Sequence, residues 1–235
     1  MPFPELPSRL AEVREVIERQ RAKGGWERPV RVVAVTKTHG PEAVRAAAAA
    51  GVGAVGENRV QEALAKQDAT ADVAVEWHLI GTLQRNKARH AVGRFALIHS
   101  VDRLDLAAEL ARRTAAGTAA DPLARQRILV QVNCSAEPQK GGVEPDALPA
   151  LLDALRDLPR LEVRGLMTMA AFDADERELH RTFALLRTLR DAAEREGHGL
   201  PELSMGMSGD YPIAVEEGAT LVRLGTILFG ARDAR

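Results

Sequence analysis

Apolar runs and amphipathic stretches alternate along almost the whole chain. The short apolar runs, several of them β-branched, are typical of strands buried on both faces. They predict strands over residues 30–36, 54–56, 75–80, 95–100, 128–132, 161–167, 202–205 and 221–224. Helical periodicity predicts helices between them over residues 41–50, 59–67, 86–92, 103–116, 145–157, 175–196 and 212–218. An amphipathic helix over residues 5–23, ended by Gly24 and Gly25, precedes the first strand.

Eight strand–helix units in this order predict a closed parallel barrel of the TIM, or (β/α)8, type with one extra N-terminal helix. An open doubly wound sheet usually has fewer strands and a reversal of strand order. No linker or change in composition divides the chain, so we expect a single domain over residues 1–235. Residues 114–127 have the composition of a surface loop.

Composition excludes several classes of partner and site. Acidic and basic residues nearly cancel to a formal charge of -1, so the sequence has no basic footprint for nucleic acid or an anionic membrane. Cys134 is the only cysteine, which excludes an internal disulfide and indicates a reducing, cytoplasmic setting. The first residues lack a secretory signal, and no apolar window is long enough to span a bilayer. The histidines have no metal-ligand spacing, so a metal site is not expected.

Lys37 is the most informative single residue, because it ends the first apolar run. The carboxyl ends of the strands of a parallel barrel share one mouth, where active sites lie. An amine that is partly desolvated there has a depressed pKa and can form a Schiff base with an aldehyde. The alternative is a lysine that only reaches solvent or pairs with Glu57.

Two small-residue turns follow the last two predicted strands, at Ser208–Gly209 and at Gly225–Thr226. Turns at these positions of a barrel recurrently bind phosphate through backbone N–H groups and a hydroxyl. An amine and a phosphate cradle at one mouth suggest a phosphorylated aldehyde, and pyridoxal 5'-phosphate (PLP) is such a molecule. Arg223, just before the second turn, is then a candidate partner for its ring nitrogen.

The chain also resembles a known family over nearly its whole length. The blocks "VAVTKTHG", "GENRVQE", "EWHLIGTLQRNK", "GLMTM", "LSMGMSGDY" and "VRLGTILFGAR" are similar, in order and spacing, to the YggS/PROSC pyridoxal phosphate homeostasis proteins. The resemblance implies a fold-type III, alanine racemase-like barrel that holds PLP as an internal aldimine. It implies a cofactor-binding set of Lys37 (aldimine), Asn58 (ring), His78 (lining), Met205, Ser208, Gly209, Arg223 (ring nitrogen), Gly225 and Thr226 (with Ser208, the phosphate).

Two positions depart from the family pattern. Family members commonly have Lys-Pro where this chain has His39-Gly40, and Pro212 stands at the start of the helix that follows the Ser208 turn. Neither change removes a cofactor ligand. A glycine at position 40 is expected to loosen the loop after Lys37.

The resemblance implies a cytoplasmic carrier that controls the PLP (vitamin B6) pool and supplies apoenzymes, without established catalysis; we expect a monomer. An arginine keeps its proton, which leaves the ring a weak electron sink. The single tyrosine, Tyr211, is not placed for proton transfer. One alternative is a small PLP-dependent amino acid racemase that uses Lys87, His78 or a dimer partner as its second proton donor. Another is a sugar-phosphate enzyme with Glu57 as base. Gln84, Asn86, Lys87 and Lys140 receive no firm role.

Overall fold

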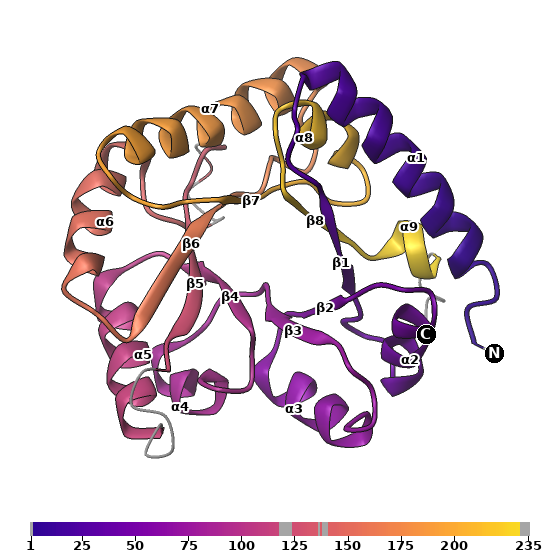
Figure 1. Cartoon of the computed structure of the whole chain (residues 1–235), viewed down its shortest axis with the longest axis horizontal. Coiled ribbons are helices and arrows are strands. Elements are labelled where there is room, and N and C mark those ends of the chain that lie inside the picture. Colours follow the sequence, from indigo (N-terminus) through magenta and orange to yellow (C-terminus); the bar gives the residue numbers. More distant parts are fainter. Residues whose placement is uncertain (1, 118–123, 136, 138–140, 231–235) are drawn as a thin grey trace.

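Eight parallel strands close into a barrel in the order of the sequence (Figure 1). The computed structural model describes residues 2–117, 124–135, 137 and 141–230. Within these residues the strands are β1 (Arg31–Val35), β2 (Ala54–Glu57), β3 (Glu76–Leu79), β4 (Leu97–Val101), β5 (Gln126–Gln131), β6 (Leu161–Met167), β7 (Glu202–Ser204) and β8 (Leu221–Leu224). β1 pairs with both β2 and β8, which closes the ring. The predicted (β/α)8 barrel is confirmed.

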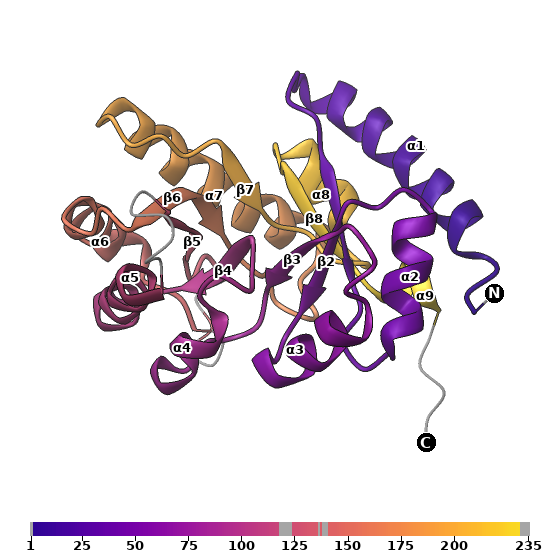
Figure 2. The ribbon, with the colours of Figure 1, turned by 60° about the horizontal axis from the view of Figure 1, so that its bottom comes forward.

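Helices form a layer around the outside of the barrel (Figures 1 and 2). The described helices are α1 (Leu6–Gly24), α2 (Pro41–Ala49), α3 (Val60–Ala69), η1 (Arg85–Lys87), α4 (Ala88–Ala91), α5 (Leu104–Gly117), η3 (Pro145–Ala147), α6 (Leu148–Arg156), α7 (Glu176–Arg195), α8 (Tyr211–Glu216) and α9 (Thr226–Phe229). None of the helices in the described part of the chain is both long and apolar enough to cross a bilayer.

The predicted N-terminal helix is present as α1 and packs against α8 and α9. Its buried residues follow the three-to-four-residue spacing of one helix face: Leu6, Leu10, Val13 and Ile17. Gly25 ends the helix in the left-handed conformation, with φ of 74°, where a residue with a side chain is strained. Trp26 then donates from Nε1 to the carbonyl oxygen of Glu216 at 2.7 Å, which fastens the chain to the end of α8.

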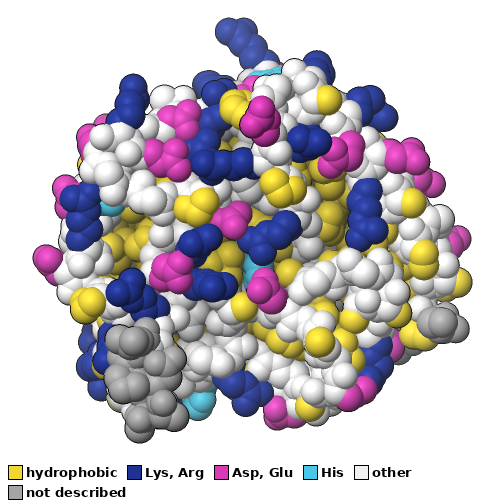
Figure 3. Space-filling model, viewed as in Figure 1, with side chains coloured by type: hydrophobic (Ala, Val, Ile, Leu, Met, Phe, Trp, Pro, Cys, Tyr) yellow, Lys and Arg dark blue, Asp and Glu magenta, His cyan; other side chains and the backbone are white. Residues whose placement is uncertain are grey.

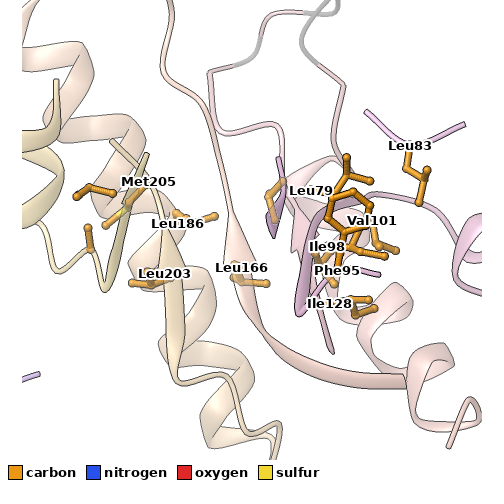
Figure 4. Packing of buried hydrophobic residues seen from close by; sticks show 14 of the residues in the cluster. Leu79, Leu83, Phe95, Ile98, Val101, Ile128, Leu166, Leu186, Leu203 and Met205 are labelled. Carbon is orange, nitrogen blue, oxygen red and sulfur yellow. The ribbon is translucent and has the colours of Figure 1, made fainter. Parts of the chain in front are cut away.

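The buried side chains form two separate layers. A small cluster fills the inside of the barrel, with one residue from most of the strands: Val33, Ala54, Leu97, Leu129, Met167 and Leu221. A much larger cluster lies between the strands and the helices, and Figure 4 shows part of it. Because side chains alternate between the two faces of a strand, the inner cluster identifies which positions of each strand point into the barrel.

Two predictions of local structure were wrong. Residues 114–127 are not a continuous loop, since α5 extends to Gly117 and β5 begins at Gln126; residues 118–123 lie outside the described residues. Gln126 is buried and donates from Nε2 to the carbonyl oxygen of Phe95 at 2.9 Å, which explains the early start of β5. The second error is α9, which was predicted only as a turn because four residues are too few for a periodic pattern.

Candidate functional site

Lys37 lies at the carboxyl end of β1, two residues beyond the strand, and is half-buried. The next residue, Thr38, has a φ of 70°. This left-handed conformation is rare and strained for a β-branched residue, and such strain persists only where the surrounding structure fixes the backbone. The backbone that presents Lys37 is therefore held in one conformation rather than free to relax.

A buried ion pair behind the strands fixes the end of β1. Lys66 on α3 donates from Nζ to Oε1 of Glu57 at 2.6 Å and to the carbonyl oxygen of Thr36 at 2.8 Å. The hydroxyl of Thr36 also donates to Oε1 of Glu57, at 2.6 Å. Glu57 is fully buried and in register with Leu79 of the outer layer, so it faces the helices and not the mouth. The alternative that Glu57 is a base at the mouth is wrong.

The loop after Lys37 is fastened by aromatic contacts. The ring of His39 lies 5.3 Å from the ring of Phe3 and 5.2 Å from the ring of Phe229 on α9 (centroid distances). Phe3 and Phe229 are themselves 5.1 Å apart in an edge-to-face arrangement. Gly40 is extended, with φ of -79°, and its N–H donates to Glu42 at 3.0 Å. His39 thus ties the loop to α9, and the effect of Gly40 on the mobility of the loop stays a prediction.

Asn58 follows β2 and is half-buried at the same end of the barrel. It lies directly against Gly81, where a Cβ atom would approach the carbonyl oxygen of Asn58 to 2.4 Å. The hydroxyl of Ser100 on β4 donates to the carbonyl oxygen of Gly81 at 2.7 Å. Only a glycine fits between these groups, so Gly81 sets the position of Asn58.

The two predicted turns lie side by side. Oγ of Ser208 accepts from the backbone N–H of Gly225 at 3.2 Å and from that of Ile227 at 3.3 Å. A Cβ on Gly225 would lie 3.5 Å from Cβ and from the carbonyl oxygen of Val35, two residues before Lys37. Gly209 and Thr226 are exposed at the rims of the turns. The turns and Lys37 therefore share the carboxyl end of the adjacent strands β1 and β8.

Arg223 points into the barrel and is buried, with 4 % of its surface exposed. Its Nη1 donates to Oγ of Ser204 at 2.6 Å, and its Nη2 donates to the carbonyl oxygen of Thr168 at 2.9 Å. Burial lowers the pKa of Arg223 to about 10, and the charge of Asp210 opposes the shift. The guanidinium is still protonated at neutral pH, so Arg223 acts only as a hydrogen-bond donor.

Two histidines lie behind Arg223 inside the barrel. Nδ1 of His99 is 2.9 Å from Oγ of Ser204, and Nε2 of His99 is 3.0 Å from Nδ1 of His78. His99 has no exposed surface and His78 only 1 %. Burial lowers the pKa of His99 well below its usual value, and the electrostatic effects of the neighbouring His78, Arg223 and Arg31 add to the shift. His99 is therefore a neutral imidazole in the folded protein.

The neutral state of His99 predicts a pH dependence of stability. The unfolded chain protonates this histidine below about pH 6.5, whereas the folded protein does not. The contribution of His99 to the free energy of unfolding is complete above that pH. It is lost as the pH falls, at about 1.4 kcal/mol per pH unit. We expect His99→Gln to remove this part of the slope when urea unfolding is measured at a series of pH values. An unchanged slope between pH 6.5 and 5 would contradict the neutral imidazole.

Three other residues of interest are buried. Met205 is fully buried in the outer layer, where Figure 4 shows it near Leu186 and Leu203, so its side chain is not brought together with the other candidates. Tyr211 is buried on α8, where burial raises its pKa and charges on α1 act on its hydroxyl. Burial raises the pKa of Cys134 to about 11, which makes this thiol a poor nucleophile.

The segment after β3 shows no arrangement that assigns it a role. Gln84 and Asn86 are exposed and Lys87 is half-buried, while Lys140 lies outside the described residues. Across the described ranges, no three His, Cys, Asp or Glu side chains are grouped so that they could hold a metal ion.

The sequence interpretation did not give any role to His99, Ser204 or Thr168. A signal for the first two was present, because both stand at inward positions of their strands. His99 is two residues after Leu97 of the inner cluster, and Ser204 is in register with Met167 and Leu221 of the same cluster. Polar residues at inward positions near strand ends are candidates to line or support a barrel site.

Comparisons with known proteins show similarity over nearly the whole chain. Residues 9–233 match the family model "Alanine racemase, N-terminal domain". The chain is 42% identical over 226 residues to the "Pyridoxal phosphate homeostasis protein" of Aquifex aeolicus, covering 95% of this chain and 97% of that one. It is 45% identical over 223 residues to the protein of the same name from Pseudomonas aeruginosa (95% and 92%). The structure of PipY of Synechococcus elongatus "with PLP bound" superposes with a TM-score of 0.82 at 39% identity (96% and 100%).

Proposed function

The chain belongs to the family of the pyridoxal phosphate homeostasis proteins, which share the alanine racemase N-terminal domain, and we propose from this that its single barrel domain binds and buffers PLP. The function is control of the vitamin B6 pool. The observation on which the proposed site depends is the meeting of the Ser208 turn and the Gly225 turn beside the end of β1, next to Lys37.

The donor set fits the three polar parts of PLP. A phosphate needs hydroxyl and N–H donors, and Oγ of Ser208 lies with two backbone N–H groups where these turns meet. The pyridine nitrogen needs a donor, and Arg223 can only donate. The aldehyde needs an amine, which Lys37 provides at the neighbouring strand end. When bound, PLP supplies an aldehyde that forms a Schiff base with a primary amine.

The site residues act by holding the cofactor and not by transferring protons. With a pKa of about 10, Arg223 keeps its proton and offers a hydrogen bond to the ring nitrogen. A ring that is not protonated withdraws electrons weakly, which supports a carrier. The relatives are named for homeostasis and not for catalysis.

The racemase alternative requires a second proton donor at the mouth. His78 is buried inside the barrel against His99, and Tyr211 is buried on α8, which packs against α1. Of the two residues named for the racemase alternative, His78 and Lys87, Lys87 is the one that is half-buried and follows a strand end. We propose that the chain is a cytoplasmic monomer that gives up PLP to apoenzymes, and that it has no racemase activity of its own.

Titration of the apoprotein with PLP tests the proposal. We expect a visible absorbance band that saturates at one PLP per chain. The loaded protein should then reactivate a PLP-dependent apoenzyme, measured by the activity of that enzyme. Absence of the band would refute the binding of PLP as a Schiff base. Racemisation of alanine or serine by the loaded protein, lost in Lys37→Ala, would refute the carrier and support the racemase.

A further inference from the structure

A chain of polar side chains runs through the barrel from Arg223 to the opposite end. It passes from Arg223 to Ser204, then to His99 and to His78, with successive distances of 2.6, 2.9 and 3.0 Å. Nε2 of His78 is 3.5 Å from Oε2 of Glu76, the first residue of β3. These polar contacts therefore connect the carboxyl end of the barrel, where the proposed PLP site lies, to its amino-terminal end.

The directions of these hydrogen bonds follow from Arg223 and from the hydroxyl proton of Ser204. Arg223 can only donate, so Oγ of Ser204 accepts from it, and among the described residues His99 is the one acceptor for the hydroxyl proton of Ser204. Nδ1 of the neutral His99 must then accept, which places the proton of His99 on Nε2. That N–H donates to Nδ1 of His78, so the proton of the His78 ring is on Nε2, toward Glu76.

At the amino-terminal end of the barrel, this chain of hydrogen bonds is anchored by charge. Glu76 has a lowered pKa because of the hydrogen bond from His78, which outweighs the opposing effect of its partial burial. The electrostatic effects of His78, Arg31 and Arg127 lower the pKa further. The carboxylate is therefore ionised and can only accept. In Figure 3, charged side chains of both signs gather around a histidine at the centre of the visible face. The charged groups around His78 at this end are Arg31, Glu76, Arg127, Arg164 and Glu202.

We propose that Ser204, His99 and His78 are positioning residues that hold Arg223 in one orientation for the cofactor ring by a one-way chain of hydrogen bonds ending at Glu76. The proposal rests on the proposed PLP site and goes beyond it. If the order were reversed, Oγ of Ser204 would accept from both Arg223 and the Nδ1–H of His99, and the hydroxyl proton of Ser204 would have no acceptor among the described residues. A hydroxyl proton without an acceptor is unfavourable in a site that is fully buried.

The first test uses the apoprotein and does not depend on PLP. Nitrogen-15 NMR of the imidazole rings distinguishes the two neutral tautomers, and His99→Gln and His78→Gln assign the two resonance sets among the six histidines. At about pH 8, where an ordinary histidine is neutral, we expect both rings to have the proton on Nε2. A proton on Nδ1 of His99 would overturn the proposed direction. The tautomers are read from the unaltered protein, and the two variants serve only to assign the resonances.

The second test removes the hydroxyl oxygen of Ser204 from the chain of hydrogen bonds. Ser204→Ala deletes the acceptor of Arg223 and the donor to His99. We expect the affinity for PLP to fall about tenfold, as for a lost hydrogen bond to a charged group, and the pH midpoint of the visible band to move. The band itself should remain, because Lys37 is intact. Thr114→Ala removes a buried hydroxyl on α5 that is not part of this chain of hydrogen bonds. This variant should change neither the affinity for PLP nor the pH midpoint.

The outcomes separate this inference from the proposed function. If the wild-type protein forms no visible band with PLP, the proposed function fails, and the NMR result still decides the direction of the hydrogen bonds. If the wild type forms the band and Ser204→Ala matches it in both affinity and pH midpoint, the positioning role of Ser204 is refuted.

Discussion

Lys37→Ala is expected to bind PLP without a visible band and to lose the cofactor on gel filtration. The variant lacks the amine that condenses with the aldehyde, so only the contacts of the phosphate turns and Arg223 remain. Because Lys37 is half-buried and not part of the core, the free energy of unfolding should change by no more than about 1 kcal/mol. Absorbance spectra and urea unfolding of the same preparation measure both effects.

The matched control for this variant is Lys23→Ala. Lys23 is exposed on α1 and pairs with Glu216, away from the mouth. The Lys23→Ala variant should keep the full visible band with PLP. Retention of the band by Lys37→Ala, or its loss in Lys87→Ala instead, would show that another lysine holds the cofactor.

Lys66→Met is expected to lower the free energy of unfolding by about 3–5 kcal/mol, the usual cost of removing one partner from a buried ion pair. Lys66 and Glu57 have 7% and 0% of their surfaces exposed. Without Lys66, the carboxylate of Glu57 is left in the outer layer with only the hydroxyl of Thr36 on Oε1, and Oε2 already has no hydrogen-bond partner among the described residues. Urea unfolding measures the loss.

Two further variants separate the buried charge from the lost side chain. The double variant Glu57→Gln with Lys66→Met removes both charges and should recover a large part of the stability. Lys23→Met breaks the exposed pair with Glu216 and should cost at most about 1 kcal/mol. Equal losses for Lys66→Met and Lys23→Met would contradict the assignment of Lys66 and Glu57 as a buried pair that fixes the end of β1.

The fold follows from the sequence because most strands are short, largely apolar runs and the longer helices have one apolar stripe. The stripe of Leu6, Leu10, Val13 and Ile17 predicts α1, and the runs at 161–167 and 221–224 predict β6 and β8 to the residue. Local signals fail where a contact distant in sequence decides the structure. Gln126 is polar, and it belongs to β5 because its side chain finds the carbonyl oxygen of Phe95.

The candidate site is only partly visible in the sequence. Lys37, Asn58 and the two turns follow strand ends, and the barrel topology alone brings strand ends together. The partner of Glu57 could not be predicted, because Lys66 reaches it from α3 across the outer layer. His99 has no neighbouring ligand pattern, so its role depends on which face of β4 points inward, and a pattern of separate apolar runs does not fix that.

The position of the covalent bond to PLP tests the central claim most directly. Borohydride reduction of the loaded protein makes the bond permanent, and peptide mass mapping then locates the added pyridoxyl group. The present account predicts a single modified peptide that contains Lys37. A group found on the peptide of Lys66, Lys87 or Lys140, or a loaded protein with no modified lysine, would contradict it.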